Sequence, residues 1–401
     1  PSAALRASLR SRAISPRHKG GFGPALLSLG HAQAQPHPPF PSLVLQLVGE
    51  AGGPDEIRMV RAAVIDILDG ATLDSARAER VLDQIMEGEA TPSQVAALLT
   101  ALRMRGETVD EVVGFARALR HHAVGIPTRH PAVLDTCGTG GGGAPTINAS
   151  TGAALVAAAA GVAVAKHGNR AVTSVCGSAD VLASLGVPIE QEPAVAAACL
   201  DEVGIAFLYA PLLHPAMRHA AGTRREIGIR TVFNILGPLA NPAGARLQVI
   251  GAPSVELADL VADALARLET QRAWVVHGLC GVDELAPNGE THVCEVSAGR
   301  VRRFRLTPAD AGLPEWPVAA VLGSTIEGNA ADLRAIFAGQ PGAKRDFVLL
   351  NAAAALVVGG RADDLREGVA LATESLDSGA VLDKLAEWQR FAAPPADDNI
   401  N

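Results

Sequence analysis

The sequence predicts an α/β protein in which a small all-helical domain precedes a larger α/β domain with a central, mostly parallel sheet. Three observations support this fold class. The length of 401 residues suits two or three domains of about 100 to 200 residues each. The pattern of apolar residues is helical throughout residues 59–125. After Pro127, short apolar runs alternate with longer alanine-rich helical stretches, which is typical of a parallel sheet covered by helices.

The helical domain expected at 59–125 carries clear start and stop signals. Capping boxes, in which a Thr is followed three residues later by Gln or Glu, begin helices at 91–94 and 108–111. Gly88 and Gly106 stand where the preceding helices should end. The segment therefore predicts three or four short helices.

The α/β domain expected at 126–401 contains five apolar runs of strand length and three helices near its end. An uncharged stretch at 149–165 approaches the length of a membrane-spanning helix, but its alanines and glycines favour a buried helix that leads into a buried strand. We therefore expect no membrane partner. The expected strands lie at 133–134, 162–165, 205–208, 247–250 and 273–276, and the helices near 329–338, 345–358 and 362–377.

The composition narrows the classes of function. With 48% hydrophobic and 19% charged residues, the chain can form an ordinary buried core. A net charge of −8 and an aromatic content of 3% argue against a nucleic-acid partner, which favours positive surfaces and stacked rings. The five cysteines include no C-x-x-C pair, so we expect reduced thiols in a cytoplasmic protein.

Residues 1–58 differ from the rest of the chain. Residues 1–49 hold five Lys or Arg, four closely spaced prolines and no Asp or Glu. This composition is typical of a transit peptide, which would direct the protein to an organelle. A translation start placed too early is the preferred interpretation, because an amphipathic pattern follows Met59 directly. We therefore expect a disordered or non-native extension without a catalytic role.

A glycine-rich turn joins the first expected strand to a helix. The strand ending at Asp135 runs into Gly138–Gly143, and Asn148–Thr151 opens the helix. Glycines let backbone N–H groups approach an anion closely, and a helix N-terminus adds a favourable dipole. A flexible linker is the alternative, but a linker is not enclosed so tightly by a strand and a helix. The turn therefore predicts a phosphate-binding site, without the spacing of a dinucleotide-binding motif or a P-loop.

Two further clusters follow other strands. The segment 166–174 (KHGNRAVTS) supplies two cations, an amide and two hydroxyls, which suit phosphate oxygens and ribose hydroxyls. Asp283 and Glu284 follow the strand at 273–276, and adjacent carboxylates there can hold hydrated Mg²⁺ together with a substrate phosphate. Lys166 or Arg170 singly, and the Asp-Glu pair on its own, are more typical of an exposed charged surface. The whole 166–174 segment beside the glycine-rich turn favours a binding site, and the acidic pair gains weight from these surroundings.

Long motifs along the chain occur in the order found in one enzyme family. They lie at 138–141 (GTGG), 148–151 (NAST), 166–174 (KHGNRAVTS), 177–180 (GSAD), 214–217 (HPAM), 224–226 (RRE), 231–242 (TVFNILGPLANP), 275–278 (VVHG) and 283–284 (DE). With these motifs the chain resembles the anthranilate phosphoribosyltransferase family, which has the nucleoside-phosphorylase type of fold. The resemblance extends from Met59 to about residue 390.

The resemblance implies a reaction, transfer of the 5-phosphoribosyl group from phosphoribosyl pyrophosphate to the amine of anthranilate in tryptophan biosynthesis. It also implies two Mg²⁺ ions per active site, a homodimer formed through the helical domain, and packing of helices from about 211–240 on that domain. It further implies that no side chain acts as an acid or base, and that Lys166 stabilises the transition state and the leaving pyrophosphate.

The site residues implied by the resemblance fall into three groups. Phosphoribosyl pyrophosphate would be bound by Gly138, Thr139, Gly140, Gly141, Thr146, Asn148, Ser150, Thr151 and Lys166. Anthranilate would be bound by Gly138, Asn169, His214 and Arg224. The metal ligands would be Ser150, Asp283 and Glu284.

Three positions depart from the family pattern. Gly142 stands where relatives usually carry Asp, Val175 stands where Lys is common, and Cys280 replaces an acidic residue. Because the Lys, Asn, Arg and acidic-pair positions remain, we expect altered affinity rather than lost activity.

Two alternative functions use the same fold. A pyrimidine-nucleoside phosphorylase would use phosphate instead of pyrophosphate, and would lack Arg224 and the HPAM motif in this arrangement. A non-catalytic, nucleic-acid-binding paralogue would need a basic face, which the net charge opposes.

Overall fold

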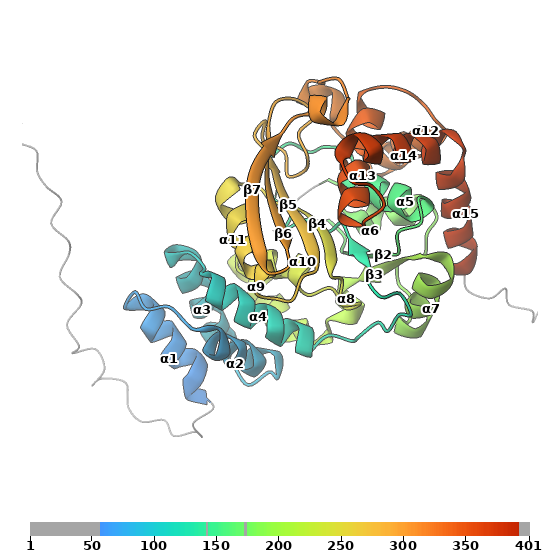
Figure 1. The fold of residues 1–401 in the computed structure, drawn as a ribbon. Helices are drawn as coiled ribbons and strands as arrows, with labels where there is room; N and C mark the ends of the chain where they lie inside the picture. Colours follow the sequence, from blue (N-terminus) through green and yellow to red (C-terminus); the bar gives the residue numbers. More distant parts are fainter. Residues whose placement is uncertain (1–56, 142, 172–174, 393–401) are drawn as a thin grey trace, which may run out of the picture. The chain divides into compact units, whose positions relative to one another are not determined.

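The computed structural model describes residues 57–141, 143–171 and 175–392 (Figure 1). The extension expected at 1–58 lies outside these residues except for 57–58, as do Gly142 and the 172–174 part of the KHGNRAVTS motif. None of the helices in the described ranges is both long and apolar enough to cross a bilayer.

Four helices begin the described chain: α1 (Ile57–Leu68), α2 (Ser75–Met86), α3 (Pro92–Arg105) and α4 (Val109–His121). Both predicted capping boxes are formed, by Thr91 with Gln94 at α3 and by Thr108 with Glu111 at α4. α3 ends at Gly106, whose φ of 90° is readily adopted only by glycine. The helical pattern predicted for this part of the chain is confirmed.

The following part of the chain builds a seven-stranded sheet with the order β3-β2-β1-β4-β5-β6-β7. The strands are β1 (Leu134–Asp135), β2 (Val164–Gly168), β3 (Ile205–Tyr209), β4 (Leu247–Gly251), β5 (Arg272–Gly278), β6 (Thr291–Ser297) and β7 (Arg300–Leu306). β1 to β5 pair in parallel, whereas β6 pairs antiparallel with both β5 and β7. The predicted mostly parallel sheet is confirmed, and the β6–β7 hairpin adds to the five expected strands.

Helices cover both faces of the sheet (Figure 1). Side chains of β5 alternate between two cores: Trp274 and Val276 join the core that contains α5 and α13, while Ala273 and Val275 join the core that contains α11 and α1 to α4. The helices of the α/β part are α5 (Ala149–Ala159), α6 (Ser178–Ser184), α7 (Pro193–Val203), α11 (Val255–Ala266), α12 (Ile326–Phe337), α13 (Ala343–Val358), α14 (Leu365–Asp377) and α15 (Ala380–Ala392).

Three short helices follow β3, and two of them contact the N-terminal helices. α9 (Arg218–Ile227) packs against α2 and α3, and α10 (Phe233–Leu239) packs against α4. α8 (Ala210–Leu213) precedes them and packs on β3. Short 3₁₀ helices lie at Pro215–Met217, Pro308–Ala311 and Val318–Val321.

The strand order places a crevice between β1 and β4. From β1 the chain proceeds outward through β2 to β3, and from β4 it proceeds outward through β5 in the other direction. Where neighbouring parallel strands lead in opposite directions, their following loops separate and leave room for a ligand at the carboxyl edge of the sheet. The glycine-rich turn follows β1, and the acidic pair follows β5. The topology therefore brings the predicted phosphate and metal sites to one edge.

Candidate active site

A cavity of about 1130 Å³ lies at this edge of the sheet. Its walls come from the loops after β1, β2 and β5, from the region of α8 to α10, and from Leu119 of α4. All but one of the predicted site residues line it: Gly138, Thr139, Gly140, Gly141, Thr146, Asn148, Ser150, Lys166, Asn169, His214, Arg224, Asp283 and Glu284. The glycine-rich turn and the acidic pair therefore face one common space.

Thr151 is the exception. Its side chain is buried (1% exposed) and does not line the cavity. Its backbone N–H donates to the carbonyl oxygen of Asn148 over 3.0 Å, and its hydroxyl has no hydrogen-bond partner within the described ranges. Because α5 begins at Ala149, its third residue already faces the core. The structure thus places the Thr151 side chain behind the cavity wall, and a role of Thr151 in binding phosphate stays a prediction.

Asn148 acts mainly inside the protein. Its Nδ2 donates to the carbonyl oxygen of Cys176 (3.3 Å), and its Oδ1 accepts from Nδ2 of Asn329 (3.0 Å). The side chain therefore connects the start of α5 to the loop before α6 and to α12. Its contribution to the site is to fix the position of the helix N-terminus.

The glycine-rich turn is held from both sides. Gly140 and Gly141 have φ values of 66° and 76°, which side chains rarely adopt. On one side, the backbone N–H of Thr139 donates to the carbonyl oxygen of Gly251 at the end of β4 (2.9 Å). On the other, Nη1 of Arg230 donates to the carbonyl oxygen of Gly140 (2.7 Å). The left-handed turn is therefore anchored in a conformation that leaves it facing the cavity.

Arg230 is a site residue that sequence reasoning missed. It lines the cavity, and its Nη1 lies 1.3 Å from the point where a Cβ of residue 141 would stand, so a side chain at 141 would displace the guanidinium from its contact with Gly140. Its Nη2 is buried and has no hydrogen-bond partner among the residues that the structure describes. Burial and Arg103 lower the pKa of Arg230, whereas the charge of Asp283 opposes that change. Arg230 thus brings an unused donor between the glycine-rich turn and the acidic pair.

Lys166 lies at the floor of the cavity, in the middle of β2. Its ammonium group donates to Oγ1 (3.0 Å) and to the carbonyl oxygen (3.3 Å) of Thr136, which leaves one N–H for a ligand. Burial lowers its pKa, and the neighbouring carboxylate of Asp135 opposes this effect. Burial also raises the pKa of Asp135 to about 6, although Lys166 and Asn241 stabilise the charged form. Asp135 therefore helps to keep the ammonium group of Lys166 charged in a largely dehydrated position.

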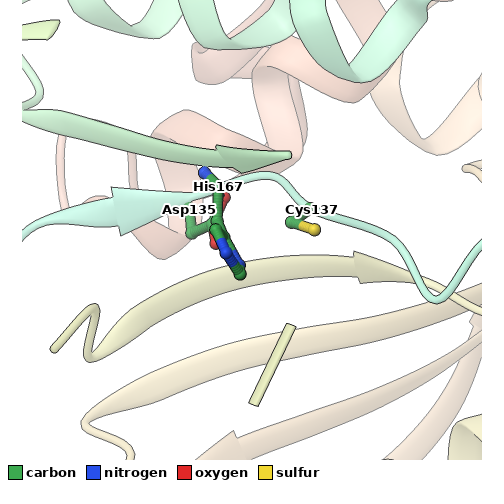
Figure 2. Close-up of side chains that lie close together, drawn as sticks. All are labelled: Asp135, Cys137 and His167. Carbon is green, nitrogen blue, oxygen red and sulfur yellow. The ribbon is translucent and has the colours of Figure 1, made fainter. Parts of the chain in front are cut away.

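Asp135, Cys137 and His167 lie close together (Figure 2), and Cys137 and His167 also line the cavity. Burial raises the pKa of the Cys137 thiol, so the thiol stays neutral. One carboxylate oxygen of Asp135 accepts from the backbone N–H of His167 (3.2 Å) and the other from Nδ2 of Asn241 (2.8 Å). Both ring nitrogens of His167 are also engaged. The group is therefore a hydrogen-bonded support for Lys166 rather than an open set of metal ligands.

Two histidines form a chain of hydrogen bonds with defined tautomers. Nδ1 of His167 lies 3.0 Å from the carbonyl oxygen of Gly237, which can only accept, so Nδ1 carries the proton. Burial lowers the pKa of His167 to about 3 and that of His214 to about 4, so both rings are neutral at pH 7. The bare Nε2 of His167 must then accept from Nε2 of His214 (3.2 Å). His214 is left with an unprotonated Nδ1 that has no partner in the described part of the chain.

These histidines predict a loss of stability in acid. An unfolded histidine takes up a proton below about pH 6.5, whereas the folded rings stay neutral down to about pH 4. The unfolded state therefore binds more protons as the pH falls from 6.5 to 4, and the free energy of unfolding drops by up to about 1.4 kcal/mol per pH unit for each ring. Urea unfolding between pH 5 and 7.5 measures this slope.

Substitution separates this effect from other titrations. His214→Gln should lower the pH slope by about one histidine's share, while His121→Gln at an exposed position should not change it. Asp135 changes the pH slope of the unfolding free energy in the opposite direction between about pH 4 and 6, because its pKa is raised in the fold. This contribution is the same in wild type and in both variants, so it cancels in the comparison. Equal slopes in wild type and His214→Gln would contradict the neutral pair.

The acidic pair has the chemistry of a site for a hard divalent cation. Glu284 is partly buried at the cavity, and both its oxygens lie 3.2 Å from Oγ1 of Thr146. Burial and the adjacent charge of Asp283 raise the pKa of Glu284 well above its ordinary value. A bound cation would offset this repulsion, and two carboxylates beside a phosphate-binding turn are the ligands that Mg²⁺ usually takes. The residues present therefore fit Mg²⁺.

The position of Asp283 is fixed by close backbone contact. A Cβ at Gly251 would stand 1.7 Å from the carbonyl oxygen of Asp283, so residue 251 must be glycine. Ser150, the other predicted metal ligand, lines the same cavity, and its carbonyl oxygen accepts from the hydroxyl of Thr136 (2.9 Å). The main chain thus sets where the three predicted ligands stand.

The side of the cavity near α9 offers a guanidinium group without an acidic partner. Arg224 stacks over the ring of Phe233, with 5.0 Å between Cζ and the ring centroid, and burial lowers its pKa. No carboxylate of the described residues lies within salt-bridge distance of it. A half-buried, unpaired arginine is less favourable than a paired one, and a ligand anion would complete it. This wall therefore suits a ligand that carries a carboxylate.

The loop after β2 is closed by Asp180. One oxygen of this carboxylate accepts from the backbone N–H groups of Ala171 (2.8 Å) and Gly177 (3.0 Å). Asn169 lies at the mouth of the loop, where its Oδ1 accepts from the backbone N–H of Arg170 (2.7 Å). Of the departures from the family pattern, Val175 lines the cavity and is exposed, Cys280 is exposed, and Gly142 lies outside the described residues.

Comparisons with known proteins agree with this geometry. Residues 130–382 match the family model described as the glycosyl transferase family a/b domain, and residues 62–123 match its helical bundle domain. The anthranilate phosphoribosyltransferase of Moorella thermoacetica is 52% identical over 327 residues, which cover 82% of this chain and 96% of the relative. The enzyme of that name from Anaeromyxobacter sp. strain K is 50% identical over 338 residues, covering 84% of this chain and all of the relative.

Solved structures give the same result. The anthranilate phosphoribosyltransferase from Thermus thermophilus superimposes with a TM-score of 0.78 at 44% identity, covering 82% of this chain and 99% of that one. The enzyme from Saccharomyces cerevisiae in complex with PRPP and Mg gives a TM-score of 0.77 at 28% identity, covering 84% and 99%. The chain belongs to the anthranilate phosphoribosyltransferase family.

Proposed function

We propose that this chain transfers the 5-phosphoribosyl group from phosphoribosyl pyrophosphate to the amine of anthranilate, giving N-(5-phosphoribosyl)anthranilate and pyrophosphate in tryptophan biosynthesis. The observation that carries the proposal is a single cavity with an anion-binding turn, a buried lysine, an acidic pair and an unpaired arginine on its walls. Relatives and solved structures with this activity in their names support it, and they support neither alternative function.

Mg²⁺ is the cofactor that the acidic pair would hold, with Ser150 as a further ligand. A related yeast structure contains Mg together with PRPP, and we propose two ions per site for this chain. When bound, Mg²⁺ neutralises charge on a departing pyrophosphate.

The chain's own residues hold and align the two substrates. Backbone N–H groups of Gly138, Gly140 and Gly141 and the remaining N–H of Lys166 would bind the diphosphate, and Arg224 would bind the carboxylate of anthranilate. Asn169 and His214 would orient the aromatic amine. This amine is unprotonated at neutral pH, so it needs no strong base to attack C1 of the ribose. Catalysis then rests on alignment and on stabilisation of the leaving group.

Arg224→Ala should raise the KM for anthranilate with little change in kcat. A carboxylate clamp remote from C1 interacts equally with the bound substrate and the transition state, so its loss weakens binding alone. Initial rates at varied anthranilate and saturating phosphoribosyl pyrophosphate measure this. Arg225→Ala, at the exposed neighbouring position, is the matched control. A defect in kcat alone would contradict the assignment of Arg224.

The function itself is tested by mixing the purified chain with Mg²⁺, phosphoribosyl pyrophosphate and anthranilate. The fluorescence of anthranilate should fall with time, and the fall should require all four components. Phosphate-dependent cleavage of pyrimidine nucleosides without this fall would favour the phosphorylase. Salt-sensitive DNA binding without it would favour the nucleic-acid-binding paralogue.

We further propose a cytoplasmic homodimer that forms through the helical domain. Two large apolar side chains of this part are unusually open: Leu68 in α1 is 69% exposed and Met104 in α3 is 81% exposed. Such residues are common at interfaces between subunits. Light scattering of the full chain should give twice the monomer mass, and Met104→Glu should shift the mass toward the monomer. A wild-type monomer would overturn the proposal.

A further inference from the structure

A second group of chemically reactive side chains lies outside the active-site cavity. Asp259 of α11 and His292 and Cys294 of β6 bring their functional atoms together, and none of the three lines the cavity. Oδ1 of Asp259 lies 3.1 Å from Nε2 of His292 and 3.0 Å from Sγ of Cys294, and the latter two atoms lie 3.2 Å apart. Oxygen, nitrogen and sulfur thus form a nearly equilateral triangle.

The fold explains why these three meet. His292 and Cys294 are two residues apart on a strand, so they point to the same face of β6. α11 packs on that face and presents Asp259 to them. β6 is paired along its whole length with β5 and β7, which makes the backbone under the group rigid. Cys294 is fully buried, while the side chains of His292 and Asp259 are 12% and 36% exposed, so an ion could enter from the Asp259 side.

We propose that Asp259, His292 and Cys294 form a binding site for a transition-metal cation of the zinc class. The donor set of carboxylate, imidazole and thiolate is typical of Zn²⁺ and Co²⁺ and unsuited to Mg²⁺, which prefers oxygen alone. Donor atoms on one tetrahedral zinc lie roughly 3.3 to 3.7 Å apart, given bonds of about 2.0 to 2.3 Å. The three atoms therefore need to spread by only a few tenths of an ångström.

Charge balance also permits the ion. In the metal-free form, Nε of Arg303 donates to Oδ1 of Asp259 (2.8 Å), and Nη2 donates to Oδ1 of Asp263 (2.8 Å). When a metal cation binds Oδ1 of Asp259, Arg303 can retain its ion pair with Asp263. The thiol of Cys294 gives its proton to solvent on binding, so the divalent ion, one carboxylate, one thiolate and one neutral imidazole together carry no net charge. The fourth position would face solvent beside Asp259.

The arrangement is not that of a cysteine nucleophile with a histidine base. In such a pair one imidazole nitrogen faces the thiol and the other is oriented by the acid. Here the same nitrogen, Nε2 of His292, faces both Cys294 and Asp259. One ion above the triangle can replace all three of these contacts, which is why the geometry points to a metal.

Co²⁺ added to the full-length, metal-stripped chain tests the proposal. A thiolate bound to Co²⁺ gives an intense charge-transfer band in the near ultraviolet, which carboxylate and imidazole ligands do not give. We expect this band to saturate at one Co²⁺ per chain and to disappear when Zn²⁺ is added. Zn²⁺ should also raise the thermal midpoint of unfolding, because it binds the folded form preferentially.

Variants assign the band to these residues. Cys294→Ser should abolish it, and His292→Gln, which alters no fully buried side chain, should weaken Co²⁺ binding by at least about 10- to 100-fold. Cys137→Ser and Cys280→Ser are the matched controls, and both should retain the band. Cys137 is chosen because it belongs to a second Asp/His/Cys group among the described residues. Absence of the band in wild type, or its persistence in both Cys294→Ser and His292→Gln, would overturn the proposal. The result does not depend on the transferase activity.

Discussion

Lys166→Ala should lower the turnover of anthranilate by about 100- to 1,000-fold, the usual cost of removing a preorganised donor that stabilises developing charge. Lys166 suits this role because its ammonium group is buried beside Thr136 with one N–H left for a ligand. Its bonds to Thr136 fix its position before substrate binds, so no reorganisation is needed during the reaction. Steady-state rates at saturating concentrations of both substrates measure the loss as a fall in kcat.

The control for Lys166 has to separate catalysis from folding. Alanine at this position leaves Asp135 buried without its cation, but the pKa of Asp135 is already raised to about 6, so this carboxyl can accept a proton and remain buried. Lys166→Met retains the volume and should lose as much activity as the alanine variant. Lys344→Met, which breaks a partly exposed pair with Asp332, should keep activity. Near wild-type turnover in a folded Lys166→Met protein would remove the proposed role.

Asp283→Ala should also lower turnover by about 100- to 1,000-fold, for a different reason. The variant removes one of two adjacent carboxylates that fit Mg²⁺ and leaves Glu284 with less repulsion, so the cation should bind more weakly. The loss should therefore shrink as Mg²⁺ is raised, which a loss of pyrophosphate contacts alone would not produce. Rates at several Mg²⁺ concentrations provide the measurement.

A matched acidic position helps to interpret the Asp283 result. Glu290 lies near the start of β6, is half-exposed, and pairs with Arg305. Glu290→Ala should leave both turnover and Mg²⁺ dependence unchanged, because surface ion pairs contribute little. Asp283→Asn preserves the shape of the side chain and should behave like Asp283→Ala. If Asp283→Ala retained full turnover at every Mg²⁺ concentration, the acidic pair would not be a metal site.

The central parallel strands could be predicted because each is a short apolar run between clear signals, whereas the β6–β7 hairpin gave no such pattern. Four arginines interrupt β7, and most of its residues are exposed. The two connecting residues, Ala298 and Gly299, both have positive φ, as a tight hairpin turn requires. Asn or Asp before Gly would have signalled this turn, but Ala rarely adopts that conformation.

The candidate site could be predicted where its residues form continuous motifs. The glycine-rich turn, the 166–171 segment and the acidic pair each carry a local signal. Arg230 could not be found in this way, because it is a single arginine whose contact with Gly140 spans 90 residues. The placement of Thr151 also depends on the exact start of α5, since a shift of one residue turns a helical side chain by about 100°.

Because Gly251 closely approaches Asp283, the end of β4 influences cation binding although β4 supplies none of the predicted metal ligands. Any side chain at position 251 would push the main chain of Asp283 away, and the carboxylates would move as a unit without loss of a single charged group. Substitution of a residue that is neither charged nor polar can therefore change the cation affinity of this protein. A survey of natural variation limited to the acidic residues themselves would overlook that source of change.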